Sequence, residues 1–167
     1  AFYMSFGDAI KQGHLTDYQV AIFTVKESDI RSMIDGDEDV AGLAKRTALA
    51  LAMCEYDLQK VLVYHSRVSS MQWFSDIGIR KVWEQIKESN KDNTGLWSGC
   101  IDGKDNADDR KSILDTFAGI NGNRRAVLSS CKTLAEGVDC PAVDGICLLD
   151  PRSNPIDIVQ IVGRAIR

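Results

Sequence analysis

Short runs of apolar residues alternate with longer segments of helical character, and this alternation restricts the fold more than any other feature of the sequence. The predicted strands cover residues 61–64, 96–101, 126–128 and 145–149. The predicted helices cover residues 40–58, 68–86 with a break near Gly78, and 106–118, and a last helix begins after Asn154, with Pro155 at its first position. Because the strands are almost wholly apolar and helices connect them, we expect an α/β fold, a parallel β-sheet with helices on both faces.

The first third of the chain has a less regular pattern. Residues 5–13 predict a short helix that a glycine ends, and residues 15–26 predict a strand because they are rich in β-forming side chains. The acidic residues at 35–39 are typical of a solvated helix start rather than of a metal site. With 167 residues, the chain is expected to form one domain, in which 27–58 is a linker or an inserted helix. Since the chain opens at Ala1 without a methionine, we expect a fragment of a larger protein.

The composition argues against several classes of protein. The net charge is −4, so a nucleic-acid contact would need a local basic patch. The five cysteines form no C-x-x-C pair and the two histidines have no zinc-like spacing to them. We therefore expect free thiols in a reducing compartment and no metal site. The sequence shows no secretory signal and no apolar run of membrane-spanning length, which favours a cytoplasmic protein without membrane contact.

Polar residues follow the predicted strands directly. The carboxyl ends of parallel strands meet at one edge of a sheet, and α/β proteins bind their ligands there. We therefore expect these residues to gather on one rim, together with the loop 129–141. The residues are Ser66, Arg67, Gly103, Lys104, Ser129, Ser130 and Asp150.

The last eight residues, QIVGRAIR, form a candidate phosphate-binding face. On a helix, Gln160, Arg164 and Arg167 share one side because of their spacing. Guanidinium groups stay charged and bind phosphate oxygens in pairs, and Gly163 lets a ligand or another backbone approach. This face therefore suits a polyphosphate. The alternative is a helix end whose basic residues balance the helix dipole.

A polar loop follows the predicted strand 126–128. It contains the hydroxyl of Thr133 and a glycine, Gly137, between the carboxylates of Glu136 and Asp139. Hydroxyls and loop amides donate hydrogen bonds to phosphate oxygens, and a carboxylate such as Asp139 can accept from ribose hydroxyls. The alternative is an ordinary surface loop with solvated acidic side chains.

Residues 126–167 resemble the second motor domain of superfamily-two helicases and translocases. The family's element E-G-x-D-x-P and, downstream of it, the element Q-x-x-G-R-x-x-R both occur, each after a predicted strand. Their form is similar to that of the branch related to restriction-enzyme motor subunits. A weaker resemblance extends upstream over 60–74 and 101–117, and residues 5–25 are similar to the lead-in from a first motor domain.

The resemblance implies a RecA-like domain of the P-loop NTPase class that closes on ATP and Mg2+, held mainly by an N-terminal RecA-like domain. Arg164 and Arg167 match the family's arginine fingers, and Gln160 matches the residue that orients phosphate or the attacking water. No G-x-x-x-x-G-K-[ST] element occurs, so the chain alone is expected to lack ATPase activity. The nucleotide-binding residues that the resemblance implies are Gly137, Asp139 and Gly163.

The resemblance also implies sequence-independent contacts to a nucleic-acid backbone, and it favours DNA over RNA. Cys131 stands where many relatives have a hydroxyl residue, so Ser129 or Ser130 is an alternative contact. The residues that match the family's nucleic-acid contacts are Ser66, Arg67, Gly103, Lys104, Ser130, Cys131 and Thr133.

Two other functions fit parts of the pattern. A non-catalytic RecA-like module would use the rim to bind nucleic acid or a protein. A stand-alone small-molecule enzyme would need a cofactor pocket, and the sequence has no glycine fingerprint for one. Trp73, Trp83 and Trp97 could stack on bases, but core packing or a domain interface is their expected role. His65 is expected to be a polar rim residue rather than an acid–base catalyst.

Overall fold

The strands form one parallel sheet, as the alternation predicts. The computed structural model describes residues 6–13, 17–33, 39–131, 143–151, 154, 158–159 and 161–163. Within these residues the strand order is β2-β3-β1-β4, and every neighbouring pair is parallel. The strands are β1 (Lys60–Tyr64), β2 (Gly95–Ile101), β3 (Arg124–Ser130) and β4 (Gly145–Leu148). All four carboxyl ends therefore lie at the same edge of the sheet.

The helices also fall close to their predicted positions. Asp39 caps α3 by accepting a hydrogen bond from the Ala41 amide at 3.2 Å, and Asn106 caps α6 by accepting from the Asp109 amide at 2.8 Å. Ile158, Val159 and residues 161–163 are helical. The helices are α1 (Phe6–Lys11), α2 (Glu27–Ile30), the 3-10 turn η1 (Arg31–Met33), α3 (Val40–Glu55), α4 (Val68–Trp73), the π-helical turn η2 (Phe74–Gly78), α5 (Ile79–Ser89) and α6 (Ala107–Gly119).

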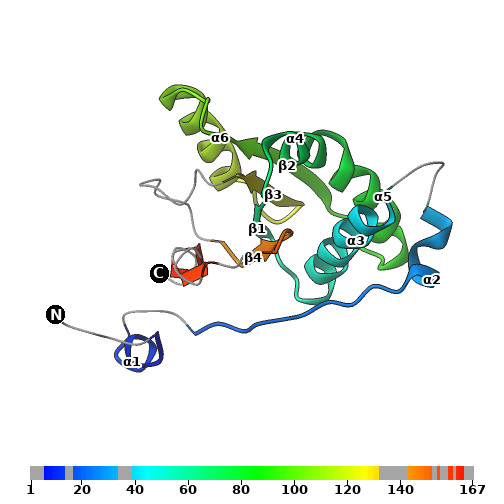
Figure 1. Ribbon diagram of the computed structural model, residues 1–167, viewed down its shortest axis with the longest axis horizontal. Coiled ribbons are helices and arrows are strands. Elements are labelled where there is room, and N and C mark those ends of the chain that lie inside the picture. The colour runs from blue at the N-terminus through cyan, green and yellow to red at the C-terminus, as the bar shows by residue number, and fades with distance from the viewer. Residues whose placement is uncertain are drawn as a thin grey trace.

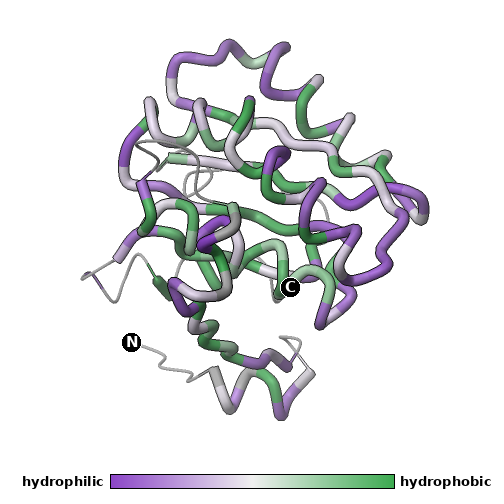
Figure 2. Tube along the Cα trace, turned by 90° about the vertical axis from the view of Figure 1, so that its right-hand side faces the viewer, coloured by the Kyte–Doolittle hydropathy of each residue, from purple (hydrophilic) through white to green (hydrophobic). Residues whose placement is uncertain are grey.

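Helices cover both faces of the sheet (Figure 1). Successive side chains of a strand point to opposite faces. Val61 and Val63 of β1 accordingly belong to the cluster under α3 and α5, whereas Leu62 and Tyr64 belong to the cluster that contains Phe117 of α6. Hydrophobic residues gather along the strands in the middle of the molecule, and hydrophilic residues lie mainly on the outer turns (Figure 2). Burial on both sides explains why these strands are almost wholly apolar.

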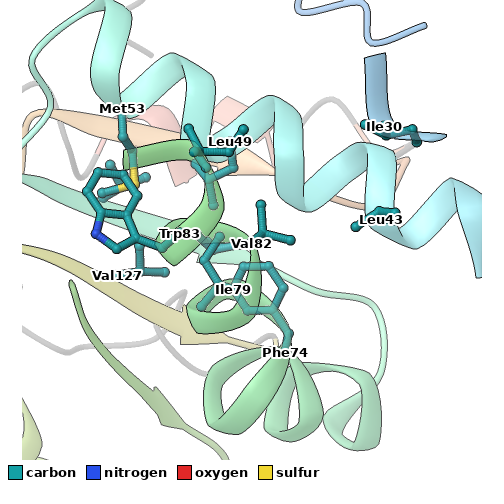
Figure 3. Close-up of a cluster of buried hydrophobic side chains, with 13 residues drawn as sticks. Ile30, Leu43, Leu49, Met53, Phe74, Ile79, Val82, Trp83 and Val127 are labelled. Carbon is teal, nitrogen blue, oxygen red and sulfur yellow. The ribbon is translucent and has the colours of Figure 1, made fainter. Parts of the chain in front are cut away.

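The larger core cluster joins α3 and α5 to the sheet. Trp83 of α5 is fully buried between Met53 of α3 and Val127 of β3 (Figure 3). Its indole N–H donates to the Thr94 carbonyl at 3.2 Å, so the one polar atom of the ring is satisfied. Ile30 of α2 belongs to the same cluster. Helix α3, which lies within the region 27–58, therefore packs as part of the core.

The predicted break at Gly78 is a π-helical turn between α4 and α5. A side chain at this position would meet Trp73, because a Cβ atom built on Gly78 lies 2.6 Å from Cζ3 of the indole. The same Cβ would lie 3.0 Å from Cδ of Arg46, whose guanidinium stacks 4.7 Å from the Trp73 ring centroid. The glycine thus allows three elements to approach closely, which explains its place in the helix.

The prediction of a strand over 15–26 is wrong for the described residues 17–26. They form an extended segment that is not part of the described sheet and that runs along the lower edge of the molecule in Figure 1. Phe23 packs edge-on against Tyr56 at 5.8 Å between ring centroids, whereas Ile22 is 91% exposed. β-forming side chains favour a strand only where a neighbouring strand pairs with them, and no described strand does so here.

Candidate nucleic-acid and nucleotide interface

The register of the sheet places the ends of its strands in one row. Tyr64 of β1 pairs with Ser130 of β3 and with Leu148 of β4, and Ser130 pairs with Ile101 of β2. The residues that directly follow the strands are thus neighbours along one edge, which we call the carboxyl-end rim. It comprises residues 65–67, 102–104, 131 and 149–150. Of the polar residues predicted to gather there, Ser66, Arg67, Gly103, Lys104 and Asp150 lie on this rim, whereas Ser129 and Ser130 lie within β3.

Asp150 is the centre of the best-defined polar contact on the rim. One of its oxygens, Oδ2, accepts hydrogen bonds from the backbone amide and the hydroxyl of Ser66, both at 2.8 Å. The other oxygen, Oδ1, forms an ion pair with Nζ of Lys45 on α3 at 3.0 Å. This carboxylate therefore joins the ends of β1 and β4 to α3.

These donors change the acidity of Asp150. Burial by itself would raise the pKa of the carboxyl group. The hydrogen bonds from Ser66 and Lys45, together with the lysine charge, outweigh burial and lower the pKa from 3.8 to about 2. The group is consequently a carboxylate at neutral pH, and its three contacts are charge-assisted hydrogen bonds.

The loop after β2 is held by side chains that bind its backbone. Asp105 accepts from the Asp102 amide at 2.7 Å, and Asp102 accepts from the Lys104 amide at 2.6 Å. The guanidinium of Arg110 on α6 donates to the Asp102 and Asp105 carbonyls at 3.5 and 3.3 Å. Lys104 is exposed beside Gly103. The loop therefore presents a cation on a firmly held backbone.

Arg67 lies at the start of α4, next to Ser66. Its backbone is extended and its carbonyl accepts from the Met71 amide at 3.1 Å. The side chain is exposed and forms no ion pair within the described part of the chain. The rim thus carries two exposed cations, Arg67 and Lys104, at positions that the sequence indicated.

Three other predicted contact residues lie deeper than expected. Ser129 and Ser130 are fully buried, and Cys131 is buried directly after them. The structure therefore does not expose the side chain of Ser129 or Ser130 as an alternative contact to Cys131. The physical reason is that β3 is a central strand, flanked by β1 and β2 up to Ser130. Thr133 lies outside the described residues.

His65 lies on the rim by its position, but its side chain is buried rather than exposed to solvent. It follows β1 directly, and its ring packs edge-on against Phe74 at 4.8 Å between centroids. Burial lowers the pKa of the imidazole from 6.5 to about 4, while nearby Asp150 partly opposes the shift. The ring is therefore neutral at physiological pH.

The nucleotide-binding prediction falls almost wholly outside the described residues. Gly163 alone is described, as a half-buried helical residue close to Ile161, which packs in the cluster that contains Phe117. No geometry for ATP or Mg2+ follows from these positions. The predicted residues outside the description are Gly137, Asp139, Gln160, Arg164 and Arg167.

The three tryptophans have different surroundings. Trp83 is a core residue, as predicted, and Trp97 is half-buried with its ring 6.0 Å from that of Phe117. Trp73 is exposed on α4, with the Arg46 guanidinium over its ring.

A second polar cluster lies at the amino end of the sheet, away from the rim. Arg125 of β3 binds Asp92 through Nε and Nη2 at 2.8 and 2.7 Å, and Nη1 donates to the Leu58 carbonyl at 2.8 Å. Arg125 and Asp92 border an open hollow of about 740 Å³ that is also lined by Phe23 and Cys54. Because the guanidinium of Arg125 donates to Asp92 and to the Leu58 carbonyl, its contacts join parts of the protein, and we interpret the cluster as structural.

The described part of the chain contains neither a cluster of metal-ligating side chains nor a helix that could span a membrane. Its His, Cys, Asp and Glu residues form no group of three that could hold a metal ion. None of its helices is both long and apolar enough to cross a membrane. The described cysteines, Cys54, Cys100, Cys131 and Cys147, are free thiols.

Known proteins share this sequence pattern and this architecture. The family model described as "Helicase conserved C-terminal domain" matches residues 44–167. The ATP-dependent rRNA helicase SPB4 of Candida albicans is 29% identical over 121 residues, which are 72% of this chain and 18% of that protein. The ATP-dependent Type ISP restriction-modification enzyme LlaBIII, solved bound to DNA, has a TM-score of 0.79 at 25% identity, over 99% of this chain and 12% of that chain.

A second solved structure supports the fold alone. The C-terminal part of the Fun30 ATPase domain has a TM-score of 0.53 at 19% identity, over 82% of this chain and 40% of that chain. The present chain thus spans less than half the length of each of these proteins.

Proposed function

The chain belongs to the helicase conserved C-terminal domain family, and on this basis we propose that it is the second RecA-like motor domain of an ATP-dependent helicase or translocase acting on nucleic acid. The observation that carries the proposal is the carboxyl-end rim. Four parallel strands end there together, and Arg67 and Lys104 are exposed on it. Exposed cations at the strand ends suit local contacts to a nucleic-acid backbone on a chain whose net charge is −4.

We propose DNA as the nucleic acid. The structure of the LlaBIII enzyme, which was solved bound to DNA, covers 99% of this chain with a TM-score of 0.79. RNA is the alternative, because the name of the SPB4 relative refers to rRNA. In either case, contacts to phosphates would position a strand without selecting its sequence.

The proposed catalytic residues are Arg164, Arg167 and Gln160, and this assignment rests on the sequence motif. Positive charge beside a transferring phosphoryl group stabilises its transition state, and loss of such an arginine lowers turnover by about 10³-fold or more. Gly137, Asp139 and Gly163 are the proposed nucleotide contacts. ATP with Mg2+ would supply the phosphoryl group, and a partner domain of the same protein would hold it. We propose that this chain alone lacks ATPase activity.

Binding of single-stranded oligonucleotides tests the rim directly. The chain is titrated with DNA and RNA of equal length over a range of salt concentrations. Arg67→Ala and Lys104→Ala should each weaken binding for every sequence and lower the slope of log K against log salt by about 0.7. Lys111→Ala is the matched control, because Lys111 is an exposed cation on the body of α6. Equal losses in all three variants would refute the assignment of the rim.

ATP hydrolysis separates the motor from the alternative, a non-catalytic RecA-like module that binds nucleic acid or a protein. The motor predicts that the complete protein hydrolyses ATP and that nucleic acid stimulates it. The binding module predicts oligonucleotide binding through Arg67 and Lys104 without stimulated hydrolysis.

A further inference from the structure

The contact between Asp150, Ser66 and Lys45 has the chemistry of a phosphate site that a carboxylate occupies. A backbone amide, a hydroxyl and an ammonium group converge on Asp150 at 2.8, 2.8 and 3.0 Å. Amides, hydroxyls and lysines are the usual donors to backbone phosphates in nucleic-acid complexes. The same three groups would therefore suit a phosphate oxygen equally well.

The two donors of Ser66 cannot serve both partners at once. A hydroxyl has one proton and a backbone amide has one, so Ser66 has no second hydrogen to give while it binds Asp150. A phosphate that used Ser66 would have to displace the carboxylate. The carboxylate would also repel the phosphate, since both are anions at neutral pH.

The contact is accessible to an incoming strand. The Lys45 side chain is 43% exposed and the Asp150 side chain is 25% exposed. Ser66 is exposed and directly precedes Arg67 on the carboxyl-end rim. An ion pair at this degree of exposure is screened by solvent, so a phosphate can compete with it.

We propose that Asp150 occupies a phosphate-binding site formed by Lys45 and Ser66, and that a backbone phosphate of the bound strand displaces it. This inference rests on the proposed function and adds two residues to it, Lys45 as a phosphate ligand and Asp150 as the group that holds the site closed. The displaced carboxylate lies at the end of β4, where the Leu149 amide donates to the Tyr64 carbonyl at 3.2 Å. Displacement of Asp150 would therefore act on the chain directly after β4.

Amide NMR spectra of the 167-residue chain test the inference. The chain is titrated separately with a single-stranded DNA oligonucleotide, an RNA oligonucleotide of equal length, ATP and inorganic phosphate. Addition of the oligonucleotide should move the Ser66 amide signal strongly, because this N–H changes its acceptor. Inorganic phosphate should move the same signal at higher concentration, and ATP shows whether a nucleotide competes for the site.

Asp150→Asn should bind the oligonucleotide about two- to five-fold more tightly than the unmodified chain, because the amide no longer competes as an anion. Asp108→Asn is the matched control: Asp108 is an exposed carboxylate in the first turn of α6, and its replacement changes the net charge equally. Ser66→Ala in the Asp150→Asn background should remove most of the gain. Thermal unfolding of each variant confirms that it is folded.

The outcomes separate the two proposals. Oligonucleotide binding that leaves the Ser66 amide unmoved overturns the inference and leaves the proposed function in place. Phosphate that moves Ser66 while neither oligonucleotide binds supports the phosphate site and contradicts the nucleic-acid function. An equal gain in affinity in Asp108→Asn, or a gain that persists when Ser66→Ala is added to Asp150→Asn, would mean that removal of any negative charge improves binding. Either result overturns the inference.

Discussion

Replacement of Arg125 by methionine should destabilise the fold strongly, because this side chain ties three segments together at the amino end of the sheet. The Arg125 side chain is only 7% exposed. Its Nε and Nη2 bind Asp92 at 2.8 and 2.7 Å, its Nη1 donates to the Leu58 carbonyl at 2.8 Å, and Nη2 also contacts Asp57 at 3.0 Å. Methionine keeps most of the length of the side chain and removes all of these contacts.

The structure indicates how large the loss should be. The Asp57 carboxylate is 81% exposed, so its ion pair contributes about 1 kcal/mol or less. Removal of one partner from a buried pair such as Arg125–Asp92 costs about 3–5 kcal/mol. Asp92 keeps two hydrogen bonds from Thr94, from the amide at 2.8 Å and from the hydroxyl at 2.6 Å. We therefore expect the lower end of this range, about 3 kcal/mol.

Urea unfolding followed by circular dichroism measures this value. Arg124→Met is the matched control, because Arg124 is the exposed neighbour on the same strand and its replacement should change the free energy of unfolding by about 0.5 kcal/mol or less. In the double variant Arg125→Met/Asp92→Asn, the loss should be smaller than the sum of the two single losses. A single loss for Arg125→Met near that of Arg124→Met, or strict additivity in the double variant, would refute this reasoning.

Three further changes test the core and the buried histidine. Gly78→Ala places a methyl group 2.6 Å from the Trp73 ring, so it should lower stability by about 1–3 kcal/mol and shift tryptophan fluorescence, and unchanged values for both would contradict the packing. Trp83→Ala should cost about 3–5 kcal/mol in urea unfolding, well above the loss for exposed Trp73→Ala; equal losses would contradict the burial difference. The pKa of His65 is lowered from 6.5 to about 4, so on acidification the unfolded state binds a proton before the folded state does. The free energy of unfolding should therefore fall as the pH drops from 6.5 to 4, and the contribution of His65 to this fall should end below pH 4. The His65→Gln variant should lack this contribution.

Most of the fold could be predicted because its strands are buried on both faces. Such strands need continuous apolar runs, and the runs predicted at 61–64, 96–101, 126–128 and 145–149 each coincide with an observed strand. The β3 strand extends to Ser130, beyond the predicted end at residue 128, because it pairs with a strand on each side. Polar residues at its end gave no signal that this strand continued.

The failed strand prediction over 15–26 has the opposite cause. Val20 and Ile22 have strand-forming side chains, but a strand needs a paired neighbour, and sequence preference alone does not report one. Likewise, His65 has the polarity of a surface residue, and only the packing of Phe74 against it makes it a buried one.

The candidate site could likewise be predicted only in part. The position of Ser66 and Arg67 on the rim followed from the parallel sheet, which places the ends of all strands at one edge. The role of Lys45 could not be predicted, because it contacts Asp150 across 105 residues of sequence and no periodic pattern marks that pair. Such side-chain contacts depend on how α3 packs on the sheet.

Nucleic-acid-stimulated ATP hydrolysis by the complete protein, measured with DNA and RNA side by side, tests the central claim most directly. A second motor domain predicts stimulated hydrolysis that survives in the control Lys111→Ala. It also predicts that Arg164→Ala and Arg167→Ala keep nucleotide binding and lose stimulated turnover by about 10³-fold or more. Wild-type turnover in both arginine variants would contradict the claim.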